Sequence, residues 1–363
     1  MIGEHRQPSS RRQFLKRGAA AAALALPATG LVPVRAAAAQ AESGVAAPLP
    51  GTITRRIGKS GELLPALGLG TFLTFDVLPG QPRDHLREVI KRYWEGGVRV
   101  VDTSPLYGSG ETTVGDVAAG FGIDGQLFLA NKIWSTGDFL ADESHALRSF
   151  EQSQQRLWRK RLDLLQCHSL VNVDFVVPLL NAWKKEGHTR YVGITHHEND
   201  YHALLAGWIE KAPVDFVQVN YSIFNRSAEE KVLAAAHSRG IGVIINMAME
   251  KGRLHKIVEG RALPGFAQEI GVRNWAQFFL KYVISHPAVT CCLSSTANPV
   301  HAAENVGALR GELPDRSMRE RMVRHMQTIP GFDRLASMPW YPDKQQQYQG
   351  LIRRSQGLLR ARS

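Results

Sequence analysis

The sequence predicts an α/β fold, a (β/α)8 TIM barrel with an N-terminal β-hairpin closing its bottom. Three observations lead to this prediction. Short runs rich in β-branched residues alternate with longer helical patterns, eight such runs occur, and no linker or change in composition interrupts them. Eight strand-helix repeats in one uninterrupted chain are typical of a single closed barrel, which we assign to residues 52–330.

The hairpin is expected in the stretch ITRRIGKSGELLP, at residues 53–65. The eight barrel strands are then expected at Ala66–Gly70, Val98–Asp102, Leu127–Lys132, Leu162–His168, Tyr191–Thr195, Phe216–Asn220, Gly242–Asn246 and Ala288–Leu293. Helical patterns fill the intervals, and several of them stop at Gly or Pro, as helices usually do. A doubly wound sheet is the alternative, but it would need a G-x-G-x-x-G turn opening a helix, and LGLGTFL offers only Gly68-x-Gly70.

The N-terminus carries the stretch SSRRQFLKRG, at residues 9–18, followed by an alanine-rich apolar run and small residues near 36–41. This order is typical of an export signal, and the paired Arg11 and Arg12 before Phe14-Leu15 resemble the twin-arginine (Tat) signal of bacteria. An ordinary Sec signal or a disordered basic tail on a cytoplasmic protein are the alternatives. We therefore expect residues 1–41 to be a signal peptide, the Tat machinery to be a partner, and the protein to be periplasmic or otherwise extracytoplasmic.

Composition excludes several classes of protein. Removing residues 1–41 removes six basic residues and one acidic residue, so the formal net charge falls from +11 to +6. No basic stripe is interleaved with aromatic residues, so nucleic acid is not expected as a partner. No stretch after the signal reaches the roughly 18 apolar residues of a membrane span, so stable membrane insertion is not expected. The basic C-terminal tail, within 331–363, is expected to be a lid or a disordered, solvated end.

The three cysteines, Cys167, Cys291 and Cys292, lie in apolar strand-like runs. Two cysteines adjacent in sequence rarely form a bridge with each other without strain. We therefore expect small buried apolar side chains rather than a disulfide framework.

Polar residues mark the ends of three predicted strands and one loop. Asp102 ends VVD, Tyr107 follows in the loop, Lys132 ends LFLANK and His168 ends LLQCH. Because a TIM barrel places its chemistry at the carboxyl ends of its strands, these four side chains should meet at one mouth. A phenol is a weak acid at its usual pKa of about 10. A nearby ammonium held by a carboxylate is expected to lower the pKa of Tyr107, while His168 orients a carbonyl oxygen.

The ordered set DTSPLYGSGE, NKIW, LLQCHSL, YVGITHH, VQVNYSIFNR and SSTANPVHAAEN resembles the aldo-keto reductase superfamily over roughly residues 52–310. The resemblance implies a barrel that binds a nicotinamide cofactor without a Rossmann domain and reduces aldehydes or ketones by hydride transfer, or catalyses the reverse. It implies catalytic roles for Tyr107 as general acid, Lys132 as its pKa partner, Asp102 as the carboxylate fixing Lys132, and His168 as the carbonyl-orienting residue.

The same resemblance implies cofactor contacts. Thr195, His196 and Gln218 match the carboxamide positions, although His196 replaces the usual Asn, and Tyr221 matches the ring stacked on the nicotinamide. Lys251 and Gly252 stand in a divergent pyrophosphate loop. The residues matching the adenosine end are Ser295, Thr296, His301, Glu304 and Asn305. Because this end carries less positive charge than the usual 2′-phosphate site, NADP is favoured over NAD only by the habit of the superfamily.

Phe72 and Trp134 match the aromatic walls of a substrate pocket for a small carbonyl or alcohol. The run His196-His197-Glu198 lacks a third ligand at a useful spacing, so no metal site is expected. An auxiliary or sensing module that uses its cofactor mainly as a ligand is the alternative function. A barrel hydrolase would need two acidic strand ends, and only Asp102 is present. The sequence leaves the substrate, the reaction direction and the oligomeric state open.

Overall fold

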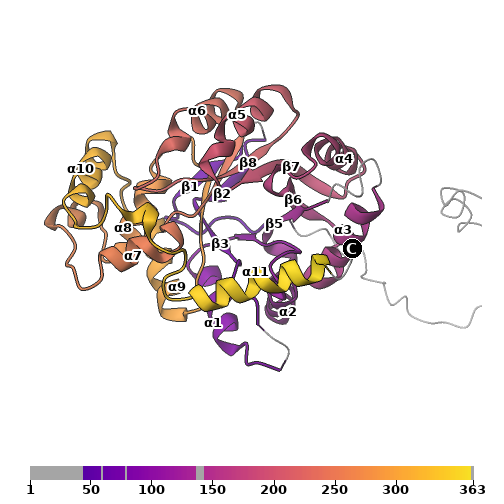
Figure 1. Cartoon of the computed structure of the whole chain (residues 1–363), viewed down its shortest axis with the longest axis horizontal. Coiled ribbons are helices and arrows are strands. Elements are labelled where there is room, and N and C mark those ends of the chain that lie inside the picture. The colour runs from indigo at the N-terminus through magenta and orange to yellow at the C-terminus, as the bar shows by residue number, and fades with distance from the viewer. Residues whose placement is uncertain (1–43, 59, 78–79, 136–142, 361–363) are drawn as a thin grey trace, which may run out of the picture. The chain divides into compact units, whose positions relative to one another are not determined.

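The computed structural model describes residues 44–58, 60–77, 80–135 and 143–360, which include the whole predicted barrel except three short internal gaps. The predicted signal peptide at residues 1–41 lies outside this part of the chain. Eight parallel strands form a closed barrel in the order β10-β3-β4-β5-β6-β7-β8-β9, surrounded by helices (Figure 1). The predicted fold class is confirmed.

All eight predicted barrel strands are present, with ends shifted by at most a few residues. Their bounds are β3 Leu67–Gly70, β4 Val100–Asp102, β5 Phe128–Ile133, β6 Leu162–Cys167, β7 Thr189–His196, β8 Phe216–Asn220, β9 Gly242–Asn246 and β10 Cys291–Ser294. The helices of the described residues are α1 Asp84–Glu95, α2 Gly110–Phe121, α3 Ser144–Leu157, α4 Val173–Lys185, α5 His202–Lys211, α6 Val232–Arg239, α7 Arg253–Ile257, α8 Trp275–Ile284, α9 Pro299–Val306, α10 Arg316–Gln327 and α11 Gln345–Arg360.

The barrel interior is filled by one side-chain set from each strand, because successive residues of a strand point to opposite faces. The apolar members from the strands include Val100, Phe128, Leu164 and Phe216, together with five other buried residues. In the same register, the residue two positions further along each strand also points inward, closer to the carboxyl end. The alternation therefore predicts which polar residues reach the mouth.

The predicted hairpin forms from β1, Thr54–Arg56, and β2, Leu63–Pro65, paired antiparallel. Ile57 and Leu64 of this hairpin are buried in the interior cluster with residues from the amino ends of the strands, such as Phe128 and Phe216. The hairpin thus closes the bottom of the barrel, as predicted, and leaves the opposite end for the site.

A second, larger apolar layer lies between the strands and the outer helices, and it includes Val217, Val219 and Tyr221 from β8 and the loop after it. Cys292 belongs to this outer layer and Cys291 to the interior one, while all three cysteines are buried and unbridged. They therefore act as small apolar side chains. Within the part of the chain described, no helix has the length and apolar character needed to cross a membrane.

The segment after α10 folds back across the carboxyl ends of the strands and ends in α11, which crosses this face in Figure 1. Arg253 at the start of α7 holds the segment, because its buried guanidinium donates to the backbone oxygens of Leu335 and Ala336, each at 3.2 Å. Gln347 of α11 donates to the backbone oxygen of Leu73 at 2.9 Å. These contacts bind residues 335–347 to the rim of the barrel.

The hairpin turn provides a test of how tightly the bottom is closed. A Cβ placed on Gly58 would lie 1.7 Å from the backbone oxygen of Gly240, an atom that cannot move without shifting the end of α6. We expect Gly58→Ala to lower the free energy of unfolding by at least about 2 kcal/mol. Gly207→Ala in α5, where nothing lies within 4 Å, is the matched control and should be neutral or stabilising by up to about 1 kcal/mol. Urea denaturation measures both, and equal effects would contradict the close approach.

Candidate active site

A buried ion pair lies at the mouth of the barrel. Lys132 Nζ donates to Asp102 Oδ1 at 2.7 Å and to the backbone oxygen of Thr103 at 2.7 Å. The two side chains are only 2% and 4% exposed. Asp102 is two residues after the interior Val100, and Lys132 two residues after the interior Ala130, so the strand alternation directs both inward. A charge buried this deeply requires a paired partner.

Tyr107 lies above this pair, on the loop between β4 and α2. Its ring centroid is 5.0 Å from Lys132 Nζ, 5.0 Å from the ring of Phe72 and 6.0 Å from the ring of His168. The structure therefore brings the four predicted catalytic residues together at one point, from three neighbouring strands and one loop.

The pKa of Tyr107 is raised well above its usual value, first by burial and then by the charges of Asp102 and Tyr341. The prediction that Lys132 would lower this pKa is therefore wrong in direction for the structure as it stands. The reason is that burial of the phenol, the largest cause, disfavours the charged phenolate more than the nearby Lys132 favours it. Tyr107 is a protonated phenol at neutral pH.

His168 is held by Ser104, whose Oγ lies 3.3 Å from Nδ1 of the imidazole. Ser104 Oγ also accepts the backbone N–H of Leu106 at 3.2 Å, so its own proton is free to be donated to Nδ1. The pKa of His168 is lowered well below its usual value by burial, and further by the charge of Lys132. A neutral imidazole that accepts at Nδ1 carries its proton on Nε2.

Two of the predicted carboxamide residues also point into the barrel. Thr195 of β7 and Gln218 of β8 are 4% and 2% exposed and are paired in register. Gln218 Oε1 accepts from Gln166 Nε2 at 3.2 Å. Among the described residues, Gln166 Oε1 and Asn246 Oδ1 are buried without a hydrogen-bond partner. The inner mouth therefore holds amide groups with unused acceptors.

His196 and Tyr221 lie elsewhere. Each lies two positions after a residue of the outer apolar layer, Ile194 for His196 and Val219 for Tyr221, so their side chains point away from the barrel interior. The His196 ring stacks on Tyr201 at 3.5 Å between centroids. Tyr221 is fully buried, packs on Tyr282, and accepts from Arg319 at 2.6 Å. The structure therefore does not place Tyr221 where its ring could stack on a ligand in the mouth.

The loop after β9 differs from a simple phosphate-binding turn. Lys251 and Gly252 both have positive φ, 54° and 88°. Lys251 Nζ lies 2.9 Å from the ring centroid of Trp340, and the backbone oxygen of Lys251 accepts from Tyr341 at 3.2 Å. The loop is thus joined to the C-terminal segment rather than open. Arg253, which also follows this loop, is committed to that segment and to Glu250.

The predicted adenosine-end residues lie around the start of α9. Asn305 is buried and donates to Tyr93 OH at 3.1 Å, and Thr296 Oγ1 accepts the backbone N–H of Asn298 at 3.0 Å. Ser295 Oγ lies 2.4 Å from the position that a Cβ on Gly70 would take, so the missing side chain leaves room for it. The remaining two residues of this set, Glu304 and His301, lie on α9, and His301 is exposed.

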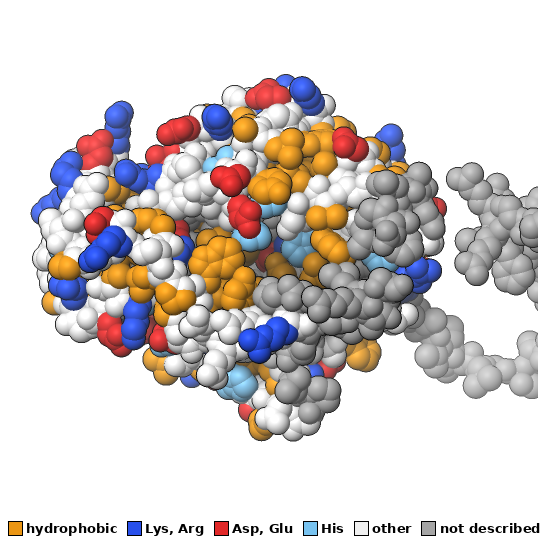
Figure 2. All heavy atoms as spheres, in the orientation of Figure 1, with side chains coloured by type: hydrophobic (Ala, Val, Ile, Leu, Met, Phe, Trp, Pro, Cys, Tyr) orange, Lys and Arg blue, Asp and Glu red, His pale blue; other side chains and the backbone are white. Residues whose placement is uncertain are grey.

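Phe72 and Trp134 are both half-buried beside the mouth. Phe72 contacts Tyr107 and also the C-terminal Tyr341 and Tyr348, whose ring centroids lie 6.1 and 6.4 Å from that of Phe72. Figure 2 shows hydrophobic side chains gathered near the centre of this face, next to histidine and acidic ones.

Sequence reasoning missed five residues of the mouth. Ser104 and Gln166 could have been found, because each lies two positions from a predicted catalytic residue and therefore on the same face of its strand. The other three, Trp340, Tyr341 and Tyr348, lie in the C-terminal segment, which was expected as a lid or a disordered end, and no repeat pattern singled out these residues.

Comparisons with known proteins agree with the fold. The model of the aldo/keto reductase family matches residues 66–321, and the chain belongs to this family. It is 26% identical over 199 residues to the aldo-keto reductase YhdN of Bacillus subtilis, covering 52% of this chain and 59% of that protein. It is 27% identical over 217 residues to L-galactose dehydrogenase of Arabidopsis thaliana, covering 55% of this chain and 66% of that protein. The chain thus spans less than two thirds of the length of each relative.

Among solved structures, the fold is similar to an aldo/keto reductase from Klebsiella pneumoniae in complex with NADP and acetate. The TM-score is 0.60 at 22% identity, over 76% of this chain and 95% of that chain. This likeness establishes the fold. The C-terminal segment that covers the mouth lies beyond residue 321, where the family match ends.

Lys251 yields a pH-dependent prediction. Burial, with Arg253 as the second cause, lowers its pKa to about 7. Between pH 7 and about 10 the unfolded chain binds a proton at this position that the folded protein does not, so the stability contribution rises with pH. Relative to Lys251→Met, the wild-type protein should gain up to about 1.4 kcal/mol of unfolding free energy per pH unit across this window.

Urea denaturation at pH 7, 8 and 9 measures the effect of Lys251. Lys211→Met, which removes an exposed lysine of α5, shows the effect of losing one positive charge at the surface. A constant difference between the wild type and Lys251→Met across these pH values would show that the Trp340 ring keeps the ammonium charged.

Proposed function

We propose that this protein is an NADP-dependent oxidoreductase that reduces an aldehyde or ketone to an alcohol, or catalyses the reverse, with Tyr107 as the general acid. The observation that supports this most is the buried Lys132–Asp102 pair at 2.7 Å, directly below a protonated phenol and beside a neutral imidazole. Family membership supports the same reaction class.

The chain's own groups supply the proton chemistry. A bound nicotinamide cofactor would supply or accept the hydride. In reduction, Tyr107 donates its proton to the carbonyl oxygen, which gains negative charge as the carbonyl carbon is reduced. His168 donates a hydrogen bond from its Nε2–H group to the same oxygen and so orients the carbonyl. The proton lies on Nε2 because Nδ1 accepts a hydrogen bond from Ser104. Lys132, fixed by Asp102, then stabilises the developing phenolate.

The inner mouth fits the nicotinamide end of the cofactor. The unused acceptors of Gln166 and Asn246, with Thr195 and Gln218, suit a carboxamide, which needs both donors and acceptors. The outer end is poor in fixed positive charge, since its exposed candidate is His301. The NADP in the Klebsiella structure supports NADP over NAD.

We further propose that residues 1–41 direct export by the twin-arginine pathway, so that the barrel acts outside the cytoplasm. The support is the sequence SRRQFLK with its alanine-rich run. This pathway carries folded proteins, which suits a barrel that must bind its cofactor before export.

Tyr107→Phe tests the chemistry. Removing the hydroxyl should lower kcat for carbonyl reduction at least about 100-fold, because general acid catalysis contributes that much or more. NADPH affinity, measured by fluorescence titration, should stay within about threefold. Since the pKa of Tyr107 is raised well above 10, wild-type kcat should not fall between pH 7 and 9 through loss of this proton.

Tyr221→Phe removes the same atom from a tyrosine that lies outside the mouth, and it should retain turnover. Wild-type kcat in Tyr107→Phe would overturn the assignment. A wild-type protein that binds NADPH but reduces no carbonyl would instead favour the sensing module.

The export proposal is tested with residues 1–41 fused to green fluorescent protein in a bacterial host. Fluorescence should appear in the periplasm, and replacing Arg11 and Arg12 together by lysine should retain it in the cytoplasm. Export that persists in a host lacking the twin-arginine translocase would contradict the proposal.

A further inference from the structure

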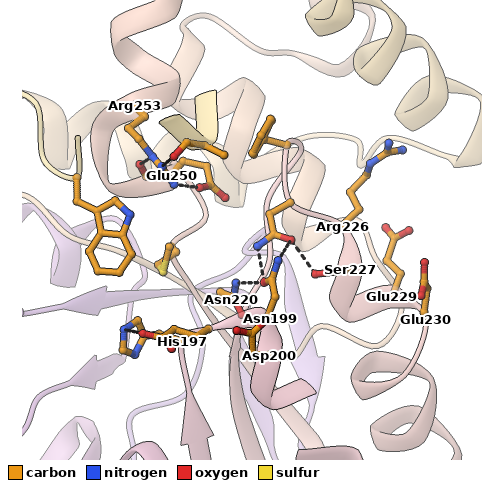
Figure 3. A pocket seen from close by; sticks show the side chains of 16 residues that line it. His197, Asn199, Asp200, Asn220, Arg226, Ser227, Glu229, Glu230, Glu250 and Arg253 are labelled. Atoms are coloured by element: carbon orange, nitrogen blue, oxygen red, sulfur yellow. Dashed lines mark hydrogen bonds and ion pairs between the residues drawn. The ribbon is translucent and has the colours of Figure 1, made fainter. Parts of the chain in front are cut away.

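A cavity of about 780 Å³ lies at the rim of the barrel, separate from the four catalytic residues. It is formed by the loops after β7, β8 and β9 and by the C-terminal segment around Ala336 and Trp340 (Figure 3). None of its lining residues belongs to the eleven positions predicted to hold the cofactor. Its size is that of a ligand-binding pocket.

His197 lines the cavity and connects it with the aromatic residues of the C-terminal segment. The His197 ring meets Trp340, with centroids 6.0 Å apart. A ligand in the cavity therefore lies next to the aromatic ring of Trp340.

A row of aromatic rings connects Tyr107 with the cavity. The ring centroids of Tyr107 and Phe72 are 5.0 Å apart, those of Phe72 and Tyr341 6.1 Å, those of Tyr341 and Tyr348 5.2 Å, and those of Tyr348 and Trp340 6.0 Å. Aromatic faces carry negative charge density, which attracts the weakly positive C–H groups of a sugar ring. The row offers such faces from the reacting end to the cavity wall.

The floor of the cavity consists of three asparagines from consecutive loops. Asn199 Oδ1 accepts from Asn220 at 2.6 Å and from Asn225 at 2.8 Å, and Asn225 Oδ1 accepts from Ser227 at 2.8 Å. His202 contacts Asn220 Oδ1 at 2.8 Å. Figure 3 shows this network facing the centre of the cavity. Each of the three amides uses one N–H in this network, so its second N–H can donate to a sugar hydroxyl.

Two carboxylates of the lining are already paired. Glu250 binds Arg253 at 2.5 Å, and Glu229 binds Arg319 at 3.0 Å. Their charges are therefore neutralised.

Three further charged side chains of the lining, Asp200, Glu230 and Arg226, form no ion pair or side-chain hydrogen bond with the described residues, and Glu198 has only the neutral His197 as a partner, at 3.6 Å. They are exposed at the opening. Two acceptors and one bidentate donor suit the hydroxyls of a neutral sugar. The excess of negative charge disfavours a phosphate or a nucleotide.

We propose that this cavity binds the distal rings of a neutral oligosaccharide or glycoside, whose terminal sugar carries the reacting carbonyl or alcohol at Tyr107. The proposal rests on the proposed function for the identity of the reacting end, while binding in the cavity stands apart from turnover. Substrate selection then depends on loops of β7 and β8 and on a C-terminal segment outside the family match.

The test begins with isothermal titration of the full-length mature protein against a panel of neutral mono-, di- and trisaccharides. At least one di- or trisaccharide should bind ten or more times tighter than its constituent monosaccharides. Glucose 6-phosphate and spermidine represent anionic and cationic ligands. Tighter binding of either than of every neutral sugar, or no sugar binding at all, would overturn the proposal.

Variants then locate the bound sugar. The double variant Asp200→Ala with Glu230→Ala should weaken disaccharide binding at least tenfold more than monosaccharide binding, and Trp340→Leu should do the same. Glu210→Ala, an exposed carboxylate on α5 away from the cavity lining, is the matched control and should change neither. If a variant weakened disaccharide and monosaccharide binding equally, the distal ring of the disaccharide would not lie in this cavity.

Tyr107→Phe separates the two proposals. It should bind the oligosaccharide with unchanged affinity while losing turnover. If the wild-type protein binds the oligosaccharide but transforms no carbonyl or alcohol, the cavity assignment holds and the proposed function fails. If the wild-type protein transforms small carbonyls but binds no oligosaccharide, the proposed function holds and the cavity assignment fails.

Discussion

The site depends on one constraint, the burial of the Lys132 ammonium inside an apolar barrel. A buried ammonium is costly unless it is paired and fully hydrogen-bonded. Asp102 and the backbone oxygen of Thr103 meet that requirement, each at 2.7 Å. Both partners come from the end of β4, adjacent to β5 in the barrel, so the pair also fixes where these two strands end relative to each other. The loop that follows carries Tyr107, and its position over the pair is a consequence.

Much of this arrangement was predictable from the sequence, because a strand has a period of two. Val100, Ala130 and Leu164 fill the interior, and counting two residues from the first two gives Asp102 and Lys132, while counting four from Leu164 gives His168. The same count places Tyr221 outward, with Val217 and Val219. Motif matching alone assigned Tyr221 to the cofactor, whereas the alternation assigns it to the outer layer. The motif match and the strand alternation agree on the catalytic residues, but they disagree on Tyr221.

The C-terminal segment was not predictable in the same way. It has no strand alternation, and what holds it is a guanidinium, Arg253, that donates to the backbone oxygens of Leu335 and Ala336. Backbone oxygens have no identity in a sequence, so such a contact leaves no motif. The contact between Lys251 and Trp340 joins two residues far apart in the chain, and neither residue type alone indicates the other. The pKa of Tyr107 was predicted with the wrong direction, because the prediction counted the neighbouring charges and not the burial of the phenol.

These features together explain why the mouth has two different walls. On the barrel side, the strand ends supply a compact set of proton-carrying groups whose charges cancel, since Asp102 neutralises Lys132 and His168 is neutral. On the opposite side, the C-terminal segment supplies Tyr341, Tyr348 and Trp340, which carry no charge at neutral pH. A charged substrate would find no complementary charge at the reacting end. A neutral, hydroxyl-rich substrate would contact aromatic faces at the reacting end and amide groups in the cavity. This arrangement suits the proposed oligosaccharide, which has to extend from one region to the other.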